Sequence, residues 1–126
     1  VGATSGLIAH ESPFLVVDLG GGSTEIVLGE GTVEAALSVD IGCVRLTERC
    51  PHSDPPTAVE VAAARDVVRE SLGEALRVVP VEQARTWVGV AGTMTTLAAL
   101  AQGMTTYDPA AIHLSRVGFA ELLPVR

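Results

Sequence analysis

The chain has 126 residues, enough for about one domain with a modest hydrophobic core. Its content of 48% hydrophobic and 18% charged residues is typical of a folded globular protein, and its apolar runs are too short to cross a bilayer. Because the net charge is −7 and a nucleic-acid-binding protein needs a basic face, we expect neither nucleic acid nor a membrane as partner.

The first 12 residues show no sustained hydrophobic period, so we expect a remnant of a helix that runs into a loop, with His10 and Glu11 in solvent. Two apolar runs follow within residues 14–28, and Gly20, Gly21 and Gly22 separate them. This pattern predicts two strands and a tight turn. Three consecutive glycines cost chain entropy, but they let backbone N–H groups approach an anion and permit positive φ. The turn is therefore a predicted phosphate-binding site, together with Ser23.

Two carboxylates, Asp18 and Glu25, flank this turn. They would repel a phosphate unless a cation lay between them, so the pattern predicts a metal, Mg²⁺ or Mn²⁺. A P-loop is excluded, because no lysine follows Gly22 and a strand takes the place of the helix. A dinucleotide-binding loop is excluded because Glu25 stands where a glycine is needed.

A second tight turn at residues 29–31 precedes a predicted third strand over 32–39, with Val33, Ala35 and Leu37 on one face. A short helix is expected from Cys43 to Cys50. On a continuous helix these cysteines lie ~10.5 Å apart, too far for a disulfide. We expect two reduced, mostly buried thiols and a cytoplasmic protein.

A capping box of Thr57 and Glu60 predicts the start of a long helix, and Pro80 predicts its end. One apolar stripe is expected along it, formed by Val61, Val68, Leu72, Leu76 and Val79.

A short buried-type strand is predicted over residues 86–91, and Gly92 and Thr93 are expected to end it before a helix over 94–100. A glycine turn at a helix N-terminus favours an anion, so Gly92 and Thr93 are further candidate phosphate-binding residues. Beyond Tyr107 we expect a loop, with His113 on the surface, and the first turns of a helix over residues 118–123.

The segments VVDLGGGSTEIVLGEG, SVDIGCVRLTE and GVAGTMTTLAAL resemble the Ppx/GppA family of exopolyphosphatases and guanosine pentaphosphate phosphohydrolases, within the actin, sugar-kinase and Hsp70 superfamily. The resemblance implies an α/β fold of the ribonuclease-H-like (actin-like ATPase) type. A three-stranded antiparallel meander would be followed by helices and a further strand. Residues 1–126 would be a single, truncated unit, the second half of a two-lobed phosphatase module. Gly42 would either lie near the phosphate channel or form only a turn between strand and helix.

The resemblance also implies a phosphoanhydride hydrolase that releases terminal phosphate from polyphosphate or converts guanosine pentaphosphate to tetraphosphate. Its general base is a glutamate expected upstream, so no catalytic residue is expected in this fragment, which should be inactive alone. The expected partners are the phosphorylated substrate, the missing N-terminal half and a second copy in a homodimer. Two alternatives stay open: a non-catalytic sensor of these phosphates and a sugar-kinase-like phosphotransferase.

Overall fold

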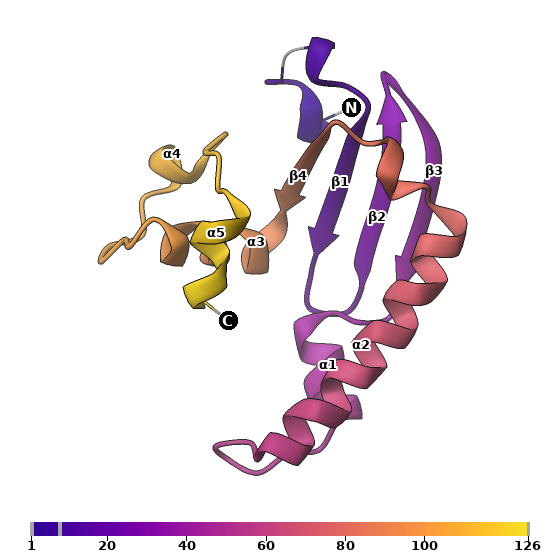
Figure 1. The fold of residues 1–126 in the computed structure, drawn as a ribbon. Helices are drawn as coiled ribbons and strands as arrows, with labels where there is room; N and C mark the ends of the chain where they lie inside the picture. The colour runs from indigo at the N-terminus through magenta and orange to yellow at the C-terminus, as the bar shows by residue number, and fades with distance from the viewer. Residues whose placement is uncertain (1, 8, 126) are drawn as a thin grey trace.

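The fold is built on a four-stranded sheet, seen in a computed structural model that describes residues 2–7 and 9–125 (Figure 1). The strand order is β3-β2-β1-β4. β1 and β2 are antiparallel, as are β2 and β3, whereas β4 runs parallel to β1. The strands are β1 (Phe14–Leu19), β2 (Thr24–Glu30), β3 (Thr32–Val39) and β4 (Thr86–Val90). The predicted mixed α/β fold, a meander with a further strand, is confirmed.

The helices follow the predicted order, with one addition. They are α1 (Cys43–Arg49), α2 (Ala58–Val78), α3 (Ala91–Ala101), α4 (Pro109–Ile112) and α5 (Phe119–Leu122), with 3₁₀ turns at Gly2–Thr4, Ala9–Glu11, Val81–Gln83 and Leu123–Val125. The expected loop after Tyr107 contains α4, because the Asp108 side chain accepts hydrogen bonds from the N–H groups of Ala110 and Ala111.

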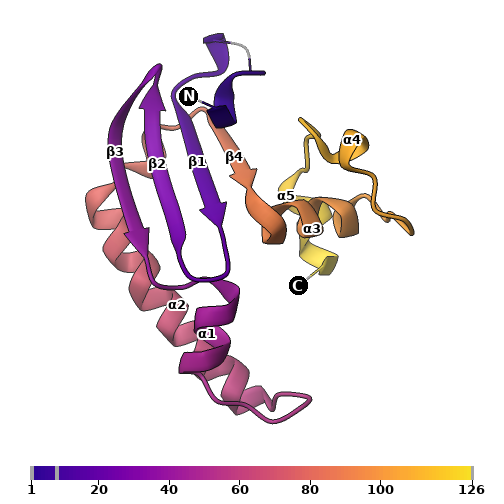
Figure 2. The same ribbon diagram turned by 180° about the vertical axis from the view of Figure 1, so that it is seen from behind.

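The hydrophobic core lies between the sheet and α2, which starts at the predicted capping box. α2 contacts β3, and α3 contacts β1 and β4 on the same side, where Gly89 allows Met94 to approach the strand closely. In the view from behind, neither α2 nor α3 lies over the opposite face of the sheet (Figure 2). The buried core residues are Leu15, Ile26, Leu28, Val39, Ile41, Ala75 and Val79.

The predicted stripe on α2 is partly wrong. Val68 and Val79 do pack on the core, but Leu76 is 57% exposed while its neighbour Ala75 is 0% exposed. The helix therefore contacts the sheet through Val68, Ala75 and Val79. Ala75 takes the core position that the sequence predicted for Leu76. A small residue at the point of contact lets the helix lie close to the strands.

Two expectations about the strands are also wrong. A β-bulge between Leu28 and Gly29 shifts the register, so Val33 pairs with Gly29 and leaves the face of Ala35 and Leu37. Val33 is 67% exposed as a result. β4 is an edge strand, not a fully buried one, and its Trp87 is 66% exposed.

The two cysteines are free, as predicted, but they are not mostly buried. Cys43 is exposed and Cys50 is half-buried, because α1 lies on the surface. Glu11 also differs from expectation, since it forms an ion pair with Arg116 and its side chain is only 17% exposed. Within residues 2–7 and 9–125, no helix combines the length and the apolar character needed to span a membrane.

Candidate phosphate-binding site

The turn between β1 and β2, residues 20–23, is here called the glycine loop. The N–H of Gly20 donates to the carbonyl of Ser23 at 3.1 Å, which closes the turn and leaves Gly21 and Gly22 at its tip. The glycines of the loop do not use the positive φ that they permit, because the described glycines with positive φ are Gly31 and Gly103. A Cβ added at Gly22 would have no neighbour within 4 Å. The fold itself therefore does not require a glycine at this tip, whereas close approach of a ligand would.

The start of α1 is hydrogen-bonded to the carbonyls of the glycine loop. The N–H groups of Cys43 and Val44 donate to the carbonyls of Gly20 and Gly21 at 3.1 and 2.9 Å. Gly42 lies directly against the loop, because a Cβ there would come within 2.3 Å of the carbonyl group of Gly21. Gly42 therefore forms the turn into α1 and contacts the glycine loop.

The carbonyl groups of the glycine loop thus accept hydrogen bonds within the fold, whereas several of its N–H groups donate none. Among the described residues, the N–H groups of Gly21, Gly22 and Ser23 have no hydrogen-bond partner. Adjacent unpaired backbone N–H groups form the concave donor sets that bind anions. The N–H of Gly20 does not belong to this set, since the turn uses it.

A cavity of about 410 Å³ joins the loop to the start of α3. It brings two predicted phosphate-binding segments together, although they are far apart in the sequence. Its lining residues are Leu19, Gly20, Gly21, Cys43, Gly92, Thr93, Thr96 and Leu97. The sequence offered no signal for the part that Cys43 and Thr96 take in this lining.

The prediction that the helix begins only after Gly92 and Thr93 is wrong, because both residues lie in the first turn of α3. The helix begins at Ala91, whose φ of 71° is in the left-handed region that a residue with a Cβ seldom adopts. Such strain is concentrated at functional sites. The Thr93 hydroxyl makes no hydrogen bond with the other described residues, so it is available to a ligand in the cavity.

The two candidate metal ligands are directly opposite one another. Asp18 pairs with Glu25 in the β1–β2 ladder, so their side chains share one face of the sheet, with Cβ atoms ~5 Å apart. This is the face that α2 and α3 leave uncovered. The alternation along β1 places Leu19 towards the cavity and Asp18 on the other face. The two carboxylates and the cavity therefore lie on opposite faces of the sheet, and the glycine loop lies between them at the end of β1.

Glu25 is held by two serine hydroxyls. Ser23 Oγ and Ser38 Oγ each donate to Glu25 Oε1 at 2.6 Å. The hydrogen bond from Ser23, followed by that from Ser38, lowers the pKa of the Glu25 carboxyl. Sequence reasoning missed Ser38, although the register of an antiparallel meander places it beside Glu25. The hydroxyls keep Glu25 ionised and fix one of its oxygens.

Asp18 and Glu25 fit a Mg²⁺ ion whose remaining coordination positions are filled by water and substrate phosphate. Within the described part of the chain, neither Asp18 nor Glu25 has an ion-pair partner, and no group of three or more His, Cys, Asp or Glu side chains could enclose a metal. Mg²⁺ commonly takes one or two carboxylates and fills its remaining positions with water and substrate phosphate. Two opposed carboxylates beside unpaired amides match that arrangement, not an all-protein cage.

The chain is similar to known proteins over nearly its whole length. Residues 1–124 match the Ppx/GppA phosphatase family. The chain is 70% identical over 124 residues to "Exopolyphosphatase 2" of Mycobacterium tuberculosis, an alignment that covers 98% of this chain and 39% of that protein. It is 40% identical to "Guanosine-5'-triphosphate,3'-diphosphate pyrophosphatase" of Photobacterium profundum, over 71% of this chain and 19% of that protein.

A solved structure gives the same assignment. The crystal structure of an exopolyphosphatase-like protein superposes with a TM-score of 0.88 and 44% identity, over 94% of this chain and 40% of that one. The chain thus spans about two fifths of the length of this protein and of the mycobacterial exopolyphosphatase. The match of the family over residues 1–124, with the glycine loop and the start of α3 at one cavity, shows that the chain belongs to the Ppx/GppA phosphatase family.

Proposed function

We propose that the chain supplies the phosphate- and metal-binding loop of a phosphoanhydride hydrolase. Its substrate would be inorganic polyphosphate, from which terminal phosphate is released, or guanosine pentaphosphate, which is converted to tetraphosphate. The similar proteins named for these two activities support both substrates. The observation that carries the proposal is the set of unpaired N–H groups at Gly21, Gly22 and Ser23, of which Gly21 lines the cavity.

In this proposal the N–H groups at the tip of the glycine loop donate to oxygens of the bound phosphate chain. The Thr93 hydroxyl and the first turn of α3 would contact the next phosphate across the cavity, where the N-terminal end of the helix favours negative charge. Phosphoryl transfer depends mainly on positioning and on stabilisation of negative charge. Fixed backbone donors supply both, because they need no rearrangement as the reaction proceeds.

Asp18 and Glu25 would hold the cation. When bound, Mg²⁺ supplies positive charge to the phosphoryl oxygens. The part of the protein itself is to keep Glu25 ionised and oriented, through Ser23 and Ser38. Like charges directly opposite in a strand pair are destabilising, so this pair also gains from a cation.

The general base is not assigned to this chain. A carboxylate that holds a cation is a weak base, and Glu25 already accepts two hydrogen bonds. We place the base, a glutamate, in the first half of a two-lobed protein, with residues 1–126 as part of the second half. The mechanism therefore needs both halves, and the residues described here bind and position the phosphates.

The test uses Gly22→Ala in the longer protein and measures the dissociation constant of pyrophosphate with Mg²⁺ by calorimetry. A Cβ at Gly22 meets nothing in the fold, so the variant should fold and yet bind pyrophosphate about tenfold more weakly, through loss of one hydrogen bond to a charged group of ~1.5 kcal/mol. Gly73→Ala is the matched control, because Gly73 lies in α2 and also has no close neighbour. If Gly22→Ala binds pyrophosphate as the control does, the glycine loop is not the phosphate site.

A further inference from the structure

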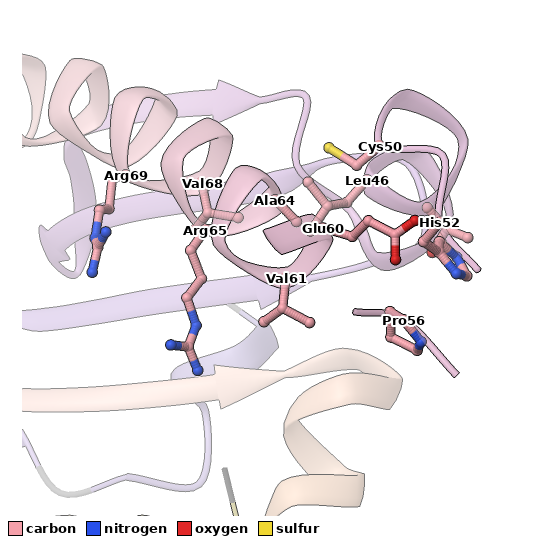
Figure 3. Close-up of a pocket in the computed structure, with 11 residues that line it drawn as sticks. Leu46, Cys50, His52, Pro56, Glu60, Val61, Ala64, Arg65, Val68 and Arg69 are labelled. Atoms are coloured by element: carbon pink, nitrogen blue, oxygen red, sulfur yellow. The ribbon is translucent and has the colours of Figure 1, made fainter. Parts of the chain in front are cut away.

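A second cavity lies away from the glycine loop. It is a groove of about 440 Å³ between the C-terminal end of α1, the following proline-containing loop and the first half of α2 (Figure 3). We call it the α1–α2 groove. Its apolar lining consists of Leu46, Cys50, Pro56, Val61, Ala64 and Val68. A cavity of about 300–1,000 Å³ with an apolar lining has the size of a small-molecule site.

Two polar groups of the groove, Thr47 and Glu60, are already hydrogen-bonded within the fold. The Thr47 hydroxyl donates to the carbonyl of Cys43 at 2.8 Å. The Glu60 carboxylate accepts hydrogen bonds from Thr57 and Ser53, donated by the N–H and the hydroxyl of each. Among the described residues, no aromatic ring other than His52 lines the groove, so a nucleobase would find little to stack on. The body of an occupant is therefore aliphatic.

The charged side chains that line the groove are the carboxylate of Glu60 and the guanidinium groups of Arg65 and Arg69. Figure 3 shows Arg65 and Arg69 extending away from α2 beside the apolar lining. Arg69 forms an ion pair with Asp66 at 3.1 Å, whereas Arg65 has no ion pair with any described residue. The Glu60 carboxylate keeps its negative charge, because its four hydrogen-bond donors are neutral groups, but it forms no ion pair with Arg65. An occupant with an anionic end would complement Arg65.

One wall of the groove leads directly to the glycine loop. Leu46 and Thr47 of α1 line the groove, and the first N–H groups of the same helix donate to the carbonyls of Gly20 and Gly21. α1 has seven residues, so these two ends are about 10 Å apart. A short rigid helix that moves at one end must move at the other, and the loop follows it through these hydrogen bonds.

We propose that the α1–α2 groove is an effector site for an aliphatic carboxylate, whose chain lies between the helices and whose head pairs with Arg65, and that occupancy changes phosphate binding through α1. The second part of this inference rests on the proposed function of the glycine loop. The coupling is reciprocal, so phosphate at the loop changes the affinity of the groove by the same factor.

The first experiment titrates the longer protein with sodium dodecanoate, below the concentration at which it forms micelles, by calorimetry. We expect saturable binding of dodecanoate and none of acetate, which has the head without the chain. Ala64→Trp fills the groove and should weaken binding about tenfold or more, while Ala63→Trp, on the exposed side of α2, should bind as the unmodified protein does. Arg65→Gln should weaken binding, and Arg77→Gln should not. Equal affinity in Ala64→Trp and Ala63→Trp, or no binding at all, overturns the site.

The second experiment measures the dissociation constant of pyrophosphate with Mg²⁺, with and without saturating dodecanoate. We expect a change of about fivefold or more in the unmodified protein and none in Ala64→Trp. An unchanged constant in the unmodified protein overturns the coupling. If pyrophosphate does not bind under any condition, the proposed function fails and the coupling fails with it. The dodecanoate titration, carried out without phosphate, still decides the groove.

Discussion

At the scale of single residues, the fold requires glycine at one of two positions at the glycine loop and does not require it at the other. Gly42 is required by the fold, because a Cβ there would lie within 2.3 Å of Gly21 and 2.5 Å of Gly22. Gly22 is not required by the fold, since a Cβ there would have no neighbour within 4 Å. Empty space alone does not mark a binding site, since Gly73 of α2 also has no close neighbour; at Gly22 the unpaired N–H groups of the loop support the proposed contact with a ligand.

This difference predicts separate effects on stability and binding. Gly42→Ala should lower the free energy of unfolding by roughly 1–3 kcal/mol, because neither backbone segment can give way without loss of hydrogen bonds. Gly22→Ala should leave that free energy close to the unmodified value. Urea unfolding of both variants checks this, and equal stability would show that the close packing of Gly42 on the loop is not maintained in solution.

Glu25 illustrates how a neighbouring strand sets the chemistry of a candidate ligand. Its pKa is lowered by the hydroxyls of Ser23 and Ser38, which donate to the ionised form. Ser38→Ala should therefore raise the pKa of Glu25, and Ser23→Ala should raise it further, because the hydrogen bond from Ser23 has the larger effect. Nuclear magnetic resonance titration of the Glu25 carboxyl carbon measures both shifts.

Ser71→Ala is the control for that titration, since Ser71 lies on α2 and has no contact with Glu25 among the described hydrogen bonds. The same pKa of Glu25 in Ser38→Ala and Ser71→Ala would contradict the arrangement. It would mean that β3 does not hold the carboxylate.

At the scale of elements, α2 depends on the capping box at its N-terminus. The N–H of Thr57, followed by its hydroxyl and the donors of Ser53, lowers the pKa of Glu60 from 4.5 to about 2. Because the pKa in the folded state lies below the unfolded value, this carboxylate contributes stability above about pH 4.5. That contribution is lost as the pH falls through about 2.

We therefore expect unfolding by urea to show a loss of stability between about pH 5 and pH 2 that is smaller in Glu60→Gln, whose side chain does not titrate. Glu74→Gln, an exposed change on the same helix, should keep the full pH dependence. Parallel curves for Glu60→Gln and the unmodified protein would mean that the capping box does not form in solution.

α1 contacts both the glycine loop and the α1–α2 groove. Its first N–H groups donate hydrogen bonds to carbonyls of the glycine loop, and its C-terminal half forms a wall of the groove. Because this helix is short and lies on the surface, its position depends on these two contacts more than on burial. A ligand at either end would therefore act on the other.

At the scale of the whole molecule, one face of the sheet is covered and the other is not (Figure 2). The uncovered face includes Val16 and Val27 beside Asp18 and Glu25, so apolar area adjoins the candidate metal ligands. The chain covers 39% of the similar exopolyphosphatase and 40% of the similar solved structure. We infer that a working site requires residues beyond those described here.

This inference predicts that residues 1–126 alone release little or no phosphate from polyphosphate with Mg²⁺, whereas the longer protein is active. The physical reason is that we assign Asp18 and Glu25 to the cation and place the general base in the first half of the two-lobed protein. Phosphate release at matched concentrations measures the difference, with Gly22→Ala in the longer protein as a check that the activity belongs to this loop. Turnover by residues 1–126 at the rate of the longer protein would show that the base lies within this chain.

The sequence alone determined the local elements. The alternation and the glycine turns predicted β3 over Thr32–Val39 as observed, and the pair Thr57 and Glu60 predicted the start of α2. Three segments, residues 16–31, 38–48 and 89–100, carried the resemblance to the family, and the match of residues 1–124 confirms it. These signals act over a few residues, through backbone geometry and hydrogen bonds to near neighbours, so they can be read from a short stretch of chain.

The tertiary structure alone decided which side chains meet. Ala75 and not Leu76 faces the sheet, Val33 changes face at a bulge, and Ser38 reaches Glu25 from another strand. The rotation of a helix and the register of a strand depend on contacts between segments distant in sequence, which no local pattern contains. For the same reason, only the folded chain brings Gly92 and Thr93 to the cavity of the glycine loop and opens the α1–α2 groove behind it.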